Sequence, residues 1–184
     1  MLLVAEHEQL PVEAARAGKP EAWDVLFKRY QLPLYVYVLE WVRDEQASLD
    51  VVQETFIAAS LHIADLQADE RFGSWLFGIA HQRCVQRWRK RDREARWLDE
   101  MAGAPSEFEP SPDDLLIRGE EEANFMRGLG QLPQPQRTAL LLHFIEEFSL
   151  EEIGRITGAS LGTVKSRIYY GKQSLRKLLR ETLP

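Results

Sequence analysis

The sequence of 184 residues has few of the features that mark disulfide-bonded, secreted or membrane-spanning proteins. Cys84 is the only cysteine, which excludes an internal disulfide framework and a zinc site made of cysteines alone. No apolar run approaches the ~20 residues that a membrane span needs. The N-terminus also has no basic segment followed by an apolar core, so it does not read as a secretory signal. These absences predict a cytoplasmic protein with no membrane insertion of its own.

Signals for strands and for enzymes are also scarce. Alternating runs of β-branched residues are missing, whereas apolar residues recur at helical spacing almost throughout, which predicts an all-α fold. There is no glycine-rich phosphate loop, and His7, His62 and His143 have no partner pattern. His81 and Cys84 are three residues apart on a predicted helix and could share a metal ion, but two ligands do not make a site. The sequence therefore predicts no enzyme, no cofactor and no metal.

Charge is distributed unevenly along the chain. The formal net charge is −6, yet residues 99–124 hold nine acidic residues against Arg118 alone, a charge of −8. The rest of the chain is therefore at +2, with an acidic block between two basic ones. Because the acid is confined to one segment, the overall negative charge does not argue against a nucleic-acid partner.

Helical periodicity and its interruptions indicate two domains. Between Ala102 and Pro112, three prolines and a glycine in acidic surroundings predict a linker that cannot bury enough apolar surface to fold. Pro33 is expected to break or kink the second helix. The predicted helices cover residues 8–17, 20–42, 46–66, 72–98, 113–130 and 135–147, with Ser111 or Asp113 as a cap for the fifth.

Near the C-terminus, two helix-start signals lie eleven residues apart with a glycine between them. Ser149 and Glu152 have the spacing of a capping box. Gly158 is suited to end that short helix in a left-handed conformation, and Ser160 can cap the next one. Two short helices joined by a glycine turn describe a helix-turn-helix, whose second helix enters the DNA major groove.

The polar side of that second helix is basic. Six basic residues and no acidic ones lie between Lys165 and Arg180. Hydroxyl, ammonium and guanidinium groups are what phosphates and base edges require. An ordinary helical hairpin with a solvated basic face is the alternative, but charge and spacing together favour DNA binding.

Three segments carry a resemblance to a known family. They are Asp50-Val-Val-Gln-Glu-Thr-Phe56, the stretch from Phe72-Gly-Ser-Trp-Leu to Arg91, and Leu132-Pro-x-x-x-Arg137 followed by Gly162-Thr-Val-Lys-Ser-Arg167. Together they resemble sigma factors of the extracytoplasmic-function (group IV) class, over nearly the whole chain.

The resemblance implies a sigma factor that binds RNA polymerase core and directs promoter-specific transcription initiation. Region 2, residues 1–98, would bind the core and the −10 element. Region 4, residues 113–184, would read the −35 element with its helix-turn-helix. A flexible acidic linker, residues 99–112, would join these two helical domains. An anti-sigma protein is the expected regulatory partner, beside the polymerase core and promoter DNA.

The resemblance also implies site residues. Those for the polymerase core are Asp50, Gln53 and Glu54. Those for the −10 element are Gln82, Arg83, Gln86, Arg87, Arg89, Lys90 and Arg91. Those for the −35 element are Thr163, Lys165, Ser166, Arg167, Tyr170 and Lys172.

Some positions depart from the family pattern. Leu49 replaces a frequent acidic residue, Ser60 a frequent aromatic one, and Gln82 the usual asparagine. Tyr170-Gly171-Lys172 stands where Arg-Ala-Arg is common, and Gly171 is expected to loosen its helix by up to ~1 kcal/mol relative to alanine.

A stand-alone operator-binding regulator is the competing hypothesis. Such a protein would share the helix-turn-helix, but it has no need of the Asp50–Phe56 face or of a basic helix in a second domain. Binding to polymerase core distinguishes the two.

Overall fold

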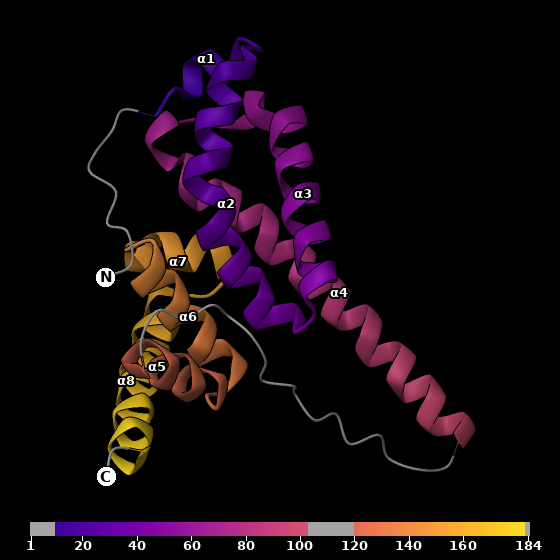
Figure 1. The fold of residues 1–184 in the computed structure, drawn as a ribbon, viewed down its shortest axis with the longest axis vertical. Helices are drawn as coiled ribbons and strands as arrows, with labels where there is room; N and C mark the ends of the chain where they lie inside the picture. Colours follow the sequence, from indigo (N-terminus) through magenta and orange to yellow (C-terminus); the bar gives the residue numbers. More distant parts are fainter. Residues whose placement is uncertain (1–9, 103–119, 183–184) are drawn as a thin grey trace. The chain divides into compact units, whose positions relative to one another are not determined.

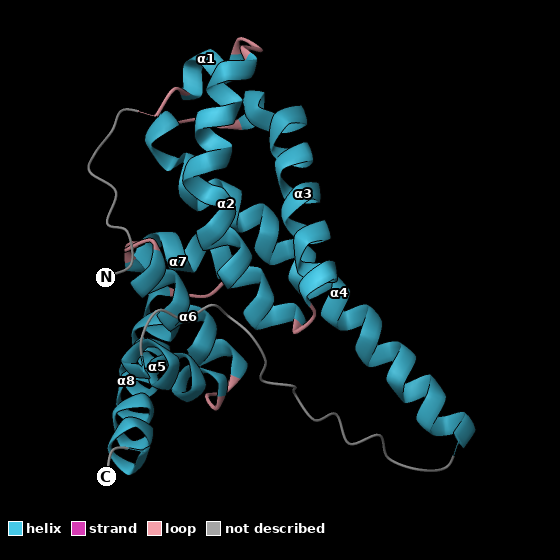
Figure 2. Cartoon of the chain, viewed as in Figure 1, coloured by secondary structure: helices cyan, strands magenta, loops and turns pink. Residues whose placement is uncertain are grey.

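The computed structural model describes residues 10–102 and 120–182, and within these ranges it is helical with no strand (Figure 2). The expected all-α fold is confirmed. The chain divides into two compact units, residues 1–109 and 110–184. Within the described residues, no helix has the length and apolar character needed to span a membrane.

The first unit is built from three long helices and shorter pieces (Figure 1). The order is α1 (Val12–Arg16), α2 (Pro20–Val42), α3 (Glu45–His62), two 3-10 turns η1 (Ile63–Asp65) and η2 (Asp69–Arg71), and α4 (Phe72–Ala102).

Aromatic side chains hold α2 and α4 together in this unit. The Phe72 ring, which is fully buried, lies 5.6 Å from that of Tyr30 and 6.3 Å from that of Trp23. Further along, the Tyr37 and Phe77 rings pack edge-on at 5.4 Å. Burial of each such side chain contributes about 1.5–3 kcal/mol, so this core fixes where α4 leaves the bundle.

Helix α2 does not break at Pro33. It continues from Pro20 to Val42, with Pro33 inside it. A proline removes one backbone donor and crowds the preceding turn. Tyr30, Leu34 and Tyr37 flank Pro33 and are all buried in the core, and their packing offsets that loss. Of the expected break or kink at Pro33, the break is therefore wrong, because tertiary packing outweighs the local penalty.

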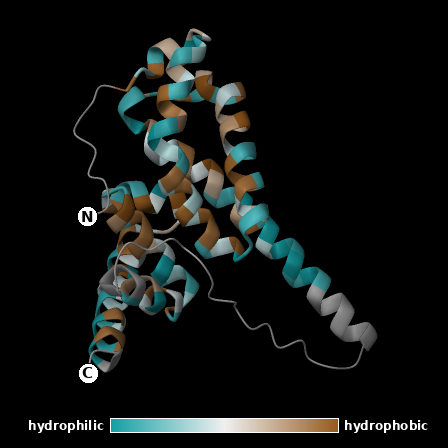
Figure 3. Cartoon of the chain, in the orientation of Figure 1, coloured by the Kyte–Doolittle hydropathy of each residue, from teal (hydrophilic) through white to brown (hydrophobic). Residues whose placement is uncertain are grey.

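Helix α4 changes character along its length. Its first part is buried, with Leu76, Phe77 and Ala80 fully inaccessible. It then continues past the ends of α2 and α3 (Figure 1) and becomes strongly hydrophilic (Figure 3). It also runs to Ala102, four residues beyond the expected end, and so into the predicted linker. The other linker residues and the predicted caps Ser111 and Asp113 lie outside the described residues.

The second unit is a four-helix arrangement within the described residues. Its helices are α5 (Glu120–Gly130), α6 (Gln134–Ile145), α7 (Leu150–Thr157) and α8 (Leu161–Thr182). Fully buried residues from all four helices form the core, namely Leu129, Leu140, Leu142, Ile153 and Val164.

The caps expected at the helix-turn-helix are confirmed. The Glu152 amide donates to Ser149 Oγ at 3.2 Å, and the Ser149 amide donates to Glu152 Oε2 at 2.9 Å. Gly158 ends α7 in the left-handed region at φ +67°. The Thr163 amide then donates to Ser160 Oγ at 3.3 Å, which caps α8. These local bonds fix the turn between α7 and α8.

Gly171 has a packing role that its helix propensity does not reveal. It is buried where α8 crosses α6, and a Cβ atom placed on it would lie 3.0 Å from Leu140 Cδ1. The expectation that Gly171 merely loosens α8 is therefore incomplete. The missing side chain allows the two helices to approach closely.

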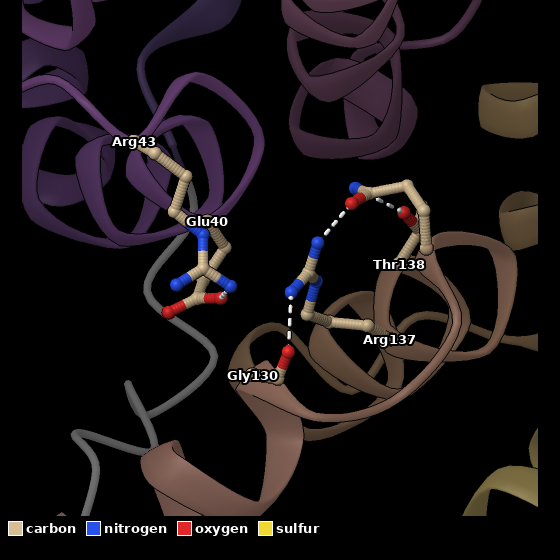
Figure 4. A network of polar contacts seen from close by, with 6 residues as sticks. Glu40, Arg43, Gly130, Arg137 and Thr138 are labelled. Atoms are coloured by element: carbon tan, nitrogen blue, oxygen red, sulfur yellow. Dashed lines mark hydrogen bonds and ion pairs between the residues drawn. The ribbon is translucent and has the colours of Figure 1, made fainter. Parts of the chain in front are cut away.

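Arg137 braces the turn between α5 and α6. It is 9% exposed, donates to the Gly130 carbonyl oxygen at 2.9 Å and also donates to Gln134 Oε1 (Figure 4). The Gly130 carbonyl lies at the C-terminal end of α5, where helix carbonyls lack intrahelical donors. The arginine of the Leu132-Pro-x-x-x-Arg137 string therefore has a structural function in this chain.

Candidate polymerase and nucleic-acid interfaces

Helix α3 presents an acidic and polar face to solvent. It begins at an Asp44 cap, whose side chain accepts from the Ala47 amide at 2.6 Å. Asp50, Gln53 and Glu54 are all exposed, while Val51, Val52 and Phe56 on the other side are buried in the core. The three residues predicted for polymerase binding therefore form one accessible surface, termed the α3 face.

Apolar side chains border the α3 face. Leu49 is 51% exposed and Ile57 is 54% exposed, and both share helical spacing with Gln53. Leu49 was identified from the sequence only as a departure from the family pattern, and Ile57 was missed. Their four-residue spacing from Gln53 is the signal that could have found both.

One residue of the α3 face is paired with a residue predicted for DNA. Arg83 on α4 donates to Glu54 Oε2 at 2.8 Å, and both side chains are partly exposed. The predicted polymerase and −10 residues therefore meet at the α3–α4 contact.

The predicted −10 residues do not share one face of α4. Gln82, Gln86 and Arg89 are exposed and, at spacings of four and three residues, lie in one stripe. Arg93 is exposed and continues this stripe by four residues, although it was not among the predicted contacts. We term these four residues the outer stripe of α4.

The other predicted −10 residues make contacts within the first unit. Arg91 donates to the Val42 carbonyl oxygen at 3.1 Å and so caps α2, where Arg43 adopts a left-handed conformation at φ 57°. Arg87 is half-buried. Lys90 lies 3.8 Å from Glu94 in an exposed ion pair. The structure thus brings Gln82, Gln86 and Arg89 together and directs Arg83 and Arg91 to internal partners.

His81 and Cys84 face the interior of the bundle. His81 Nδ1 lies 2.7 Å from Tyr37 Oη, and the His81 ring packs edge-on against Trp41 at 5.2 Å. Burial, only partly opposed by Arg87, raises the pKa of the Cys84 thiol to about 12, so the thiolate that binds metals is disfavoured. Among the described residues, no group of three or more potential ligands could hold a metal ion.

The second unit presents the predicted −35 residues on α8. Thr163, Lys165, Ser166 and Tyr170 are exposed, and Arg167 is half-buried. The hydroxyls of Thr163 and Ser166 already have local partners, because Thr163 Oγ1 lies 2.8 Å from Ser160 Oγ and Ser166 Oγ donates to the Gly162 carbonyl.

Lys172 is held by residues of α6. Its ammonium group lies 3.2 Å from His143 Nε2 and 5.3 Å from the centre of the Phe144 ring. Burial and the neighbouring Lys172 charge lower the pKa of His143, against opposing effects of the Phe148 backbone and Glu147. A neutral His143 can accept a hydrogen bond from the ammonium group, which fixes the position of Lys172.

Two exposed residues of α8, Tyr169 and Gln173, lie near Ser166 but were not predicted from the sequence as −35 contacts. Tyr169 is 59% exposed, and Gln173 is exposed one turn further along the same side. Both lie with Ser166 on the side opposite the buried Val164, Ile168 and Leu175. Both could have been predicted from the sequence, because they lie opposite the apolar positions of the helical pattern.

Comparison with known families gives two matches that lie in separate units. Residues 26–94 match Sigma-70 region 2, and residues 122–175 match Sigma-70, region 4. The α3 face and residues 72–94 of α4 lie within the first match, and α7 with residues 161–175 of α8 lies within the second.

Curated relatives match along almost the whole chain. The RNA polymerase sigma-H factor of Pseudomonas aeruginosa is 32% identical over 99% of this chain and 98% of its own length. The ECF RNA polymerase sigma factor SigW of Bacillus subtilis is 29% identical over 92% of this chain and 95% of its own.

Solved structures share the fold. A structure of the sigma factor RpoE in complex with the anti-sigma factor NepR from Bartonella quintana gives a TM-score of 0.68 at 24% identity, over 86% of this chain and 98% of that one. CnrH in complex with the cytosolic domain of CnrY gives 0.67 at 24% identity, over 97% and 100%.

Proposed function

This chain belongs to the sigma-70 family, in its extracytoplasmic-function class, and we propose that it binds RNA polymerase core and directs promoter-specific transcription initiation. The observation that carries the proposal is the presence of two basic helices in separate units of one chain. Helix α4 belongs to the unit that also has the α3 face, and α8 belongs to the helix-turn-helix.

The α3 face is the proposed docking surface for the core. Asp50 and Glu54 supply negative charge, and the flanking Leu49 and Ile57 supply apolar area. Interfaces combine an apolar centre with a polar rim, so the expected partner surface has basic and apolar side chains. The departure at Leu49 adds apolar contact area where an acidic residue would add charge.

The outer stripe of α4 is the proposed −10 surface. Arg89 and Arg93 can follow the phosphate backbone, while the amides of Gln82 and Gln86 can donate to and accept from base edges. Arg83, Lys90 and Arg91 have partners within the chain, and Arg87 is half-buried. They would therefore support this surface more than contact DNA directly.

Helix α8 is the proposed −35 reader, with Lys165, Arg167 and Lys172 at phosphates. The chain would act in the cytoplasm, where core polymerase and DNA are found, and without catalytic activity, since it would select where the polymerase starts. Because two of the solved structures that share the fold are complexes with other proteins, we also propose regulation by an anti-sigma partner.

Variants that change either the α3 face or helix α8, but not both, test this function. Asp50→Asn with Glu54→Gln should weaken binding to core polymerase and leave binding to −35 DNA unchanged. Lys165→Ala with Arg167→Ala should reduce −35-dependent transcription and leave core binding intact. A stand-alone operator-binding regulator would bind DNA through α8 but would not bind core at all, so failure of the unmodified chain to bind core would overturn the proposal.

A further inference from the structure

Helix α8 has an exposed stripe in which one predicted −35 contact lies beside two residues that were not predicted to contact DNA. Ser166, Tyr169 and Gln173 lie at spacings of three and four residues, so they share one side of the helix. The opposite side is buried against the rest of the unit. Between Ser166 and Gln173, the side of α8 that points away from its own domain therefore contains one hydroxyl, one phenol and one side-chain amide.

Charge around the stripe identifies its occupant as DNA. Between Lys165 and Arg180 the chain has six basic residues and no acidic one, and Lys165 and Lys172 border the stripe. An α-helix with its side chains is about 10–12 Å in diameter, which fits the ~12 Å width of the major groove. A helix held in the groove by flanking phosphate contacts would direct this stripe toward the base edges.

Two side chains of the stripe are available for a ligand, whereas the third, Ser166, donates to the Gly162 carbonyl oxygen. Within the part of the chain that the structure describes, the side-chain amide of Gln173 makes no hydrogen bond to another residue. The Tyr169 ring is 59% exposed and is steadied by an edge-on contact with Tyr170, at 5.3 Å between ring centres. Neither residue contributes to the buried core of the unit.

We propose that Tyr169 and Gln173 determine which −35 sequence this chain selects, and that they recognise A·T pairs. An amide side chain matches adenine, because it donates to N7 and accepts from the N6 amino group at the same time. An aromatic ring suits the methyl group of a neighbouring thymine. The inference rests on the proposed function, since it gives α8 its specificity within promoter recognition.

The position commonly filled by arginine supports this specificity. Arginine pairs with guanine through O6 and N7, and here that position is Tyr170, which offers no guanidinium group. Tyr170 therefore cannot make the bidentate contact that selects guanine, and the neighbouring residues of the stripe would supply the discrimination.

The test uses the full chain with core polymerase on a promoter library whose −35 element is randomised. The unmodified holoenzyme should select adenine at one position by about 5- to 150-fold over the other bases. Gln173→Ala should abolish that preference, and Gln173→Glu should shift it toward cytosine, whose amino group donates to a carboxylate. Tyr169→Phe should keep the preference for the neighbouring thymine, and Tyr169→Ala should lose it. Ser174→Ala, an exposed neighbour on another side of the helix, is the matched control and should select as the unmodified chain does.

The possible failures are distinguishable. If the unmodified holoenzyme selects a −35 sequence and Gln173→Ala and Tyr169→Ala select the same sequence equally well, the inference is overturned and the proposed function stands. If the unmodified chain neither binds core nor changes promoter choice, both are overturned.

Discussion

Arg83 on α4 donates a hydrogen bond of 2.8 Å to Glu54 on α3. The pair joins a residue proposed for −10 DNA to a residue proposed for the polymerase. Because both groups are partly exposed, the interaction is expected to stabilise the fold by only about 0.2–1 kcal/mol. Removal of either partner, alone and together with the other, measures how strongly the two side chains interact.

We predict that Glu54→Gln and Arg83→Gln are coupled in a double-mutant cycle. Chemical denaturation at low salt should give an interaction free energy of about 0.2–1 kcal/mol, and this value should fall as salt screens the pair. Asp50→Asn, an exposed change on the same helix, should show no coupling to Arg83→Gln. A coupling near zero at low salt would mean that the two side chains do not interact in solution.

Two arginines of α4 should respond differently to removal. Arg91→Ala deletes the part-buried hydrogen bond to the Val42 carbonyl, and should lower the free energy of unfolding by about 0.5–1.5 kcal/mol. Arg89→Ala removes an exposed residue of the outer stripe, and should change stability by no more than about 0.5 kcal/mol while it weakens holoenzyme binding to −10 DNA. Equal losses of stability would contradict the division of α4 into an outer stripe and an internally bonded side.

The pKa of His143 should lie below its usual value of ~6.5. Since folding disfavours the charged imidazole, the unfolded chain binds the proton first, and stability should fall as the pH drops below the unfolded pKa. An NMR titration of the histidine resonance, assigned with His143→Gln, measures the pKa. Lys172→Met should raise it and Glu147→Gln should lower it further. Titration of the unmodified chain at or above ~6.5 would show that burial and Lys172 do not act as described.

Gly171→Ala should not bring the stabilisation that helix propensity alone predicts. Alanine favours a helix interior over glycine by up to ~1 kcal/mol, but the new Cβ would lie 3.0 Å from Leu140 Cδ1. We expect the free energy of unfolding to rise by less than about 0.5 kcal/mol, or to fall. Gly78→Ala on α4 is the control, because nothing lies within 4 Å of its new Cβ, and it should gain stability. Both are measured by chemical denaturation, and equal gains would contradict the close approach of α6 and α8.

Features that depend on neighbouring residues can be predicted from the sequence, whereas features that depend on tertiary packing cannot. The Ser149–Glu152 capping box and the left-handed Gly158 depend on residues three to nine positions apart, so the sequence predicts them well. The bonds from Arg83 to Glu54 and from Arg91 to Val42 join residues 29 and 49 positions apart. Only the packed bundle reveals such contacts, and they reassign two residues that a basic pattern alone would give to DNA.

The same distinction applies to glycine and proline. Pro33 is a helix breaker by local chemistry, yet α2 continues through it because core packing outweighs the lost bond. Gly171 is a weak helix residue by local chemistry, yet it lies where α6 and α8 meet. In both cases the decisive neighbours come from tertiary packing, which propensity cannot include.

The central claim, that one chain uses two DNA-binding units to direct RNA polymerase, is tested most directly by run-off transcription. Core polymerase with and without the chain is supplied with a randomised promoter library, and transcripts are sequenced. The account predicts transcripts that require the chain, with selected −10 and −35 elements at a fixed spacing, and loss of −35 selection alone in the Lys165→Ala, Arg167→Ala variant. Initiation by core that is unchanged by the chain, with DNA binding confined to a single operator-like site, would contradict it.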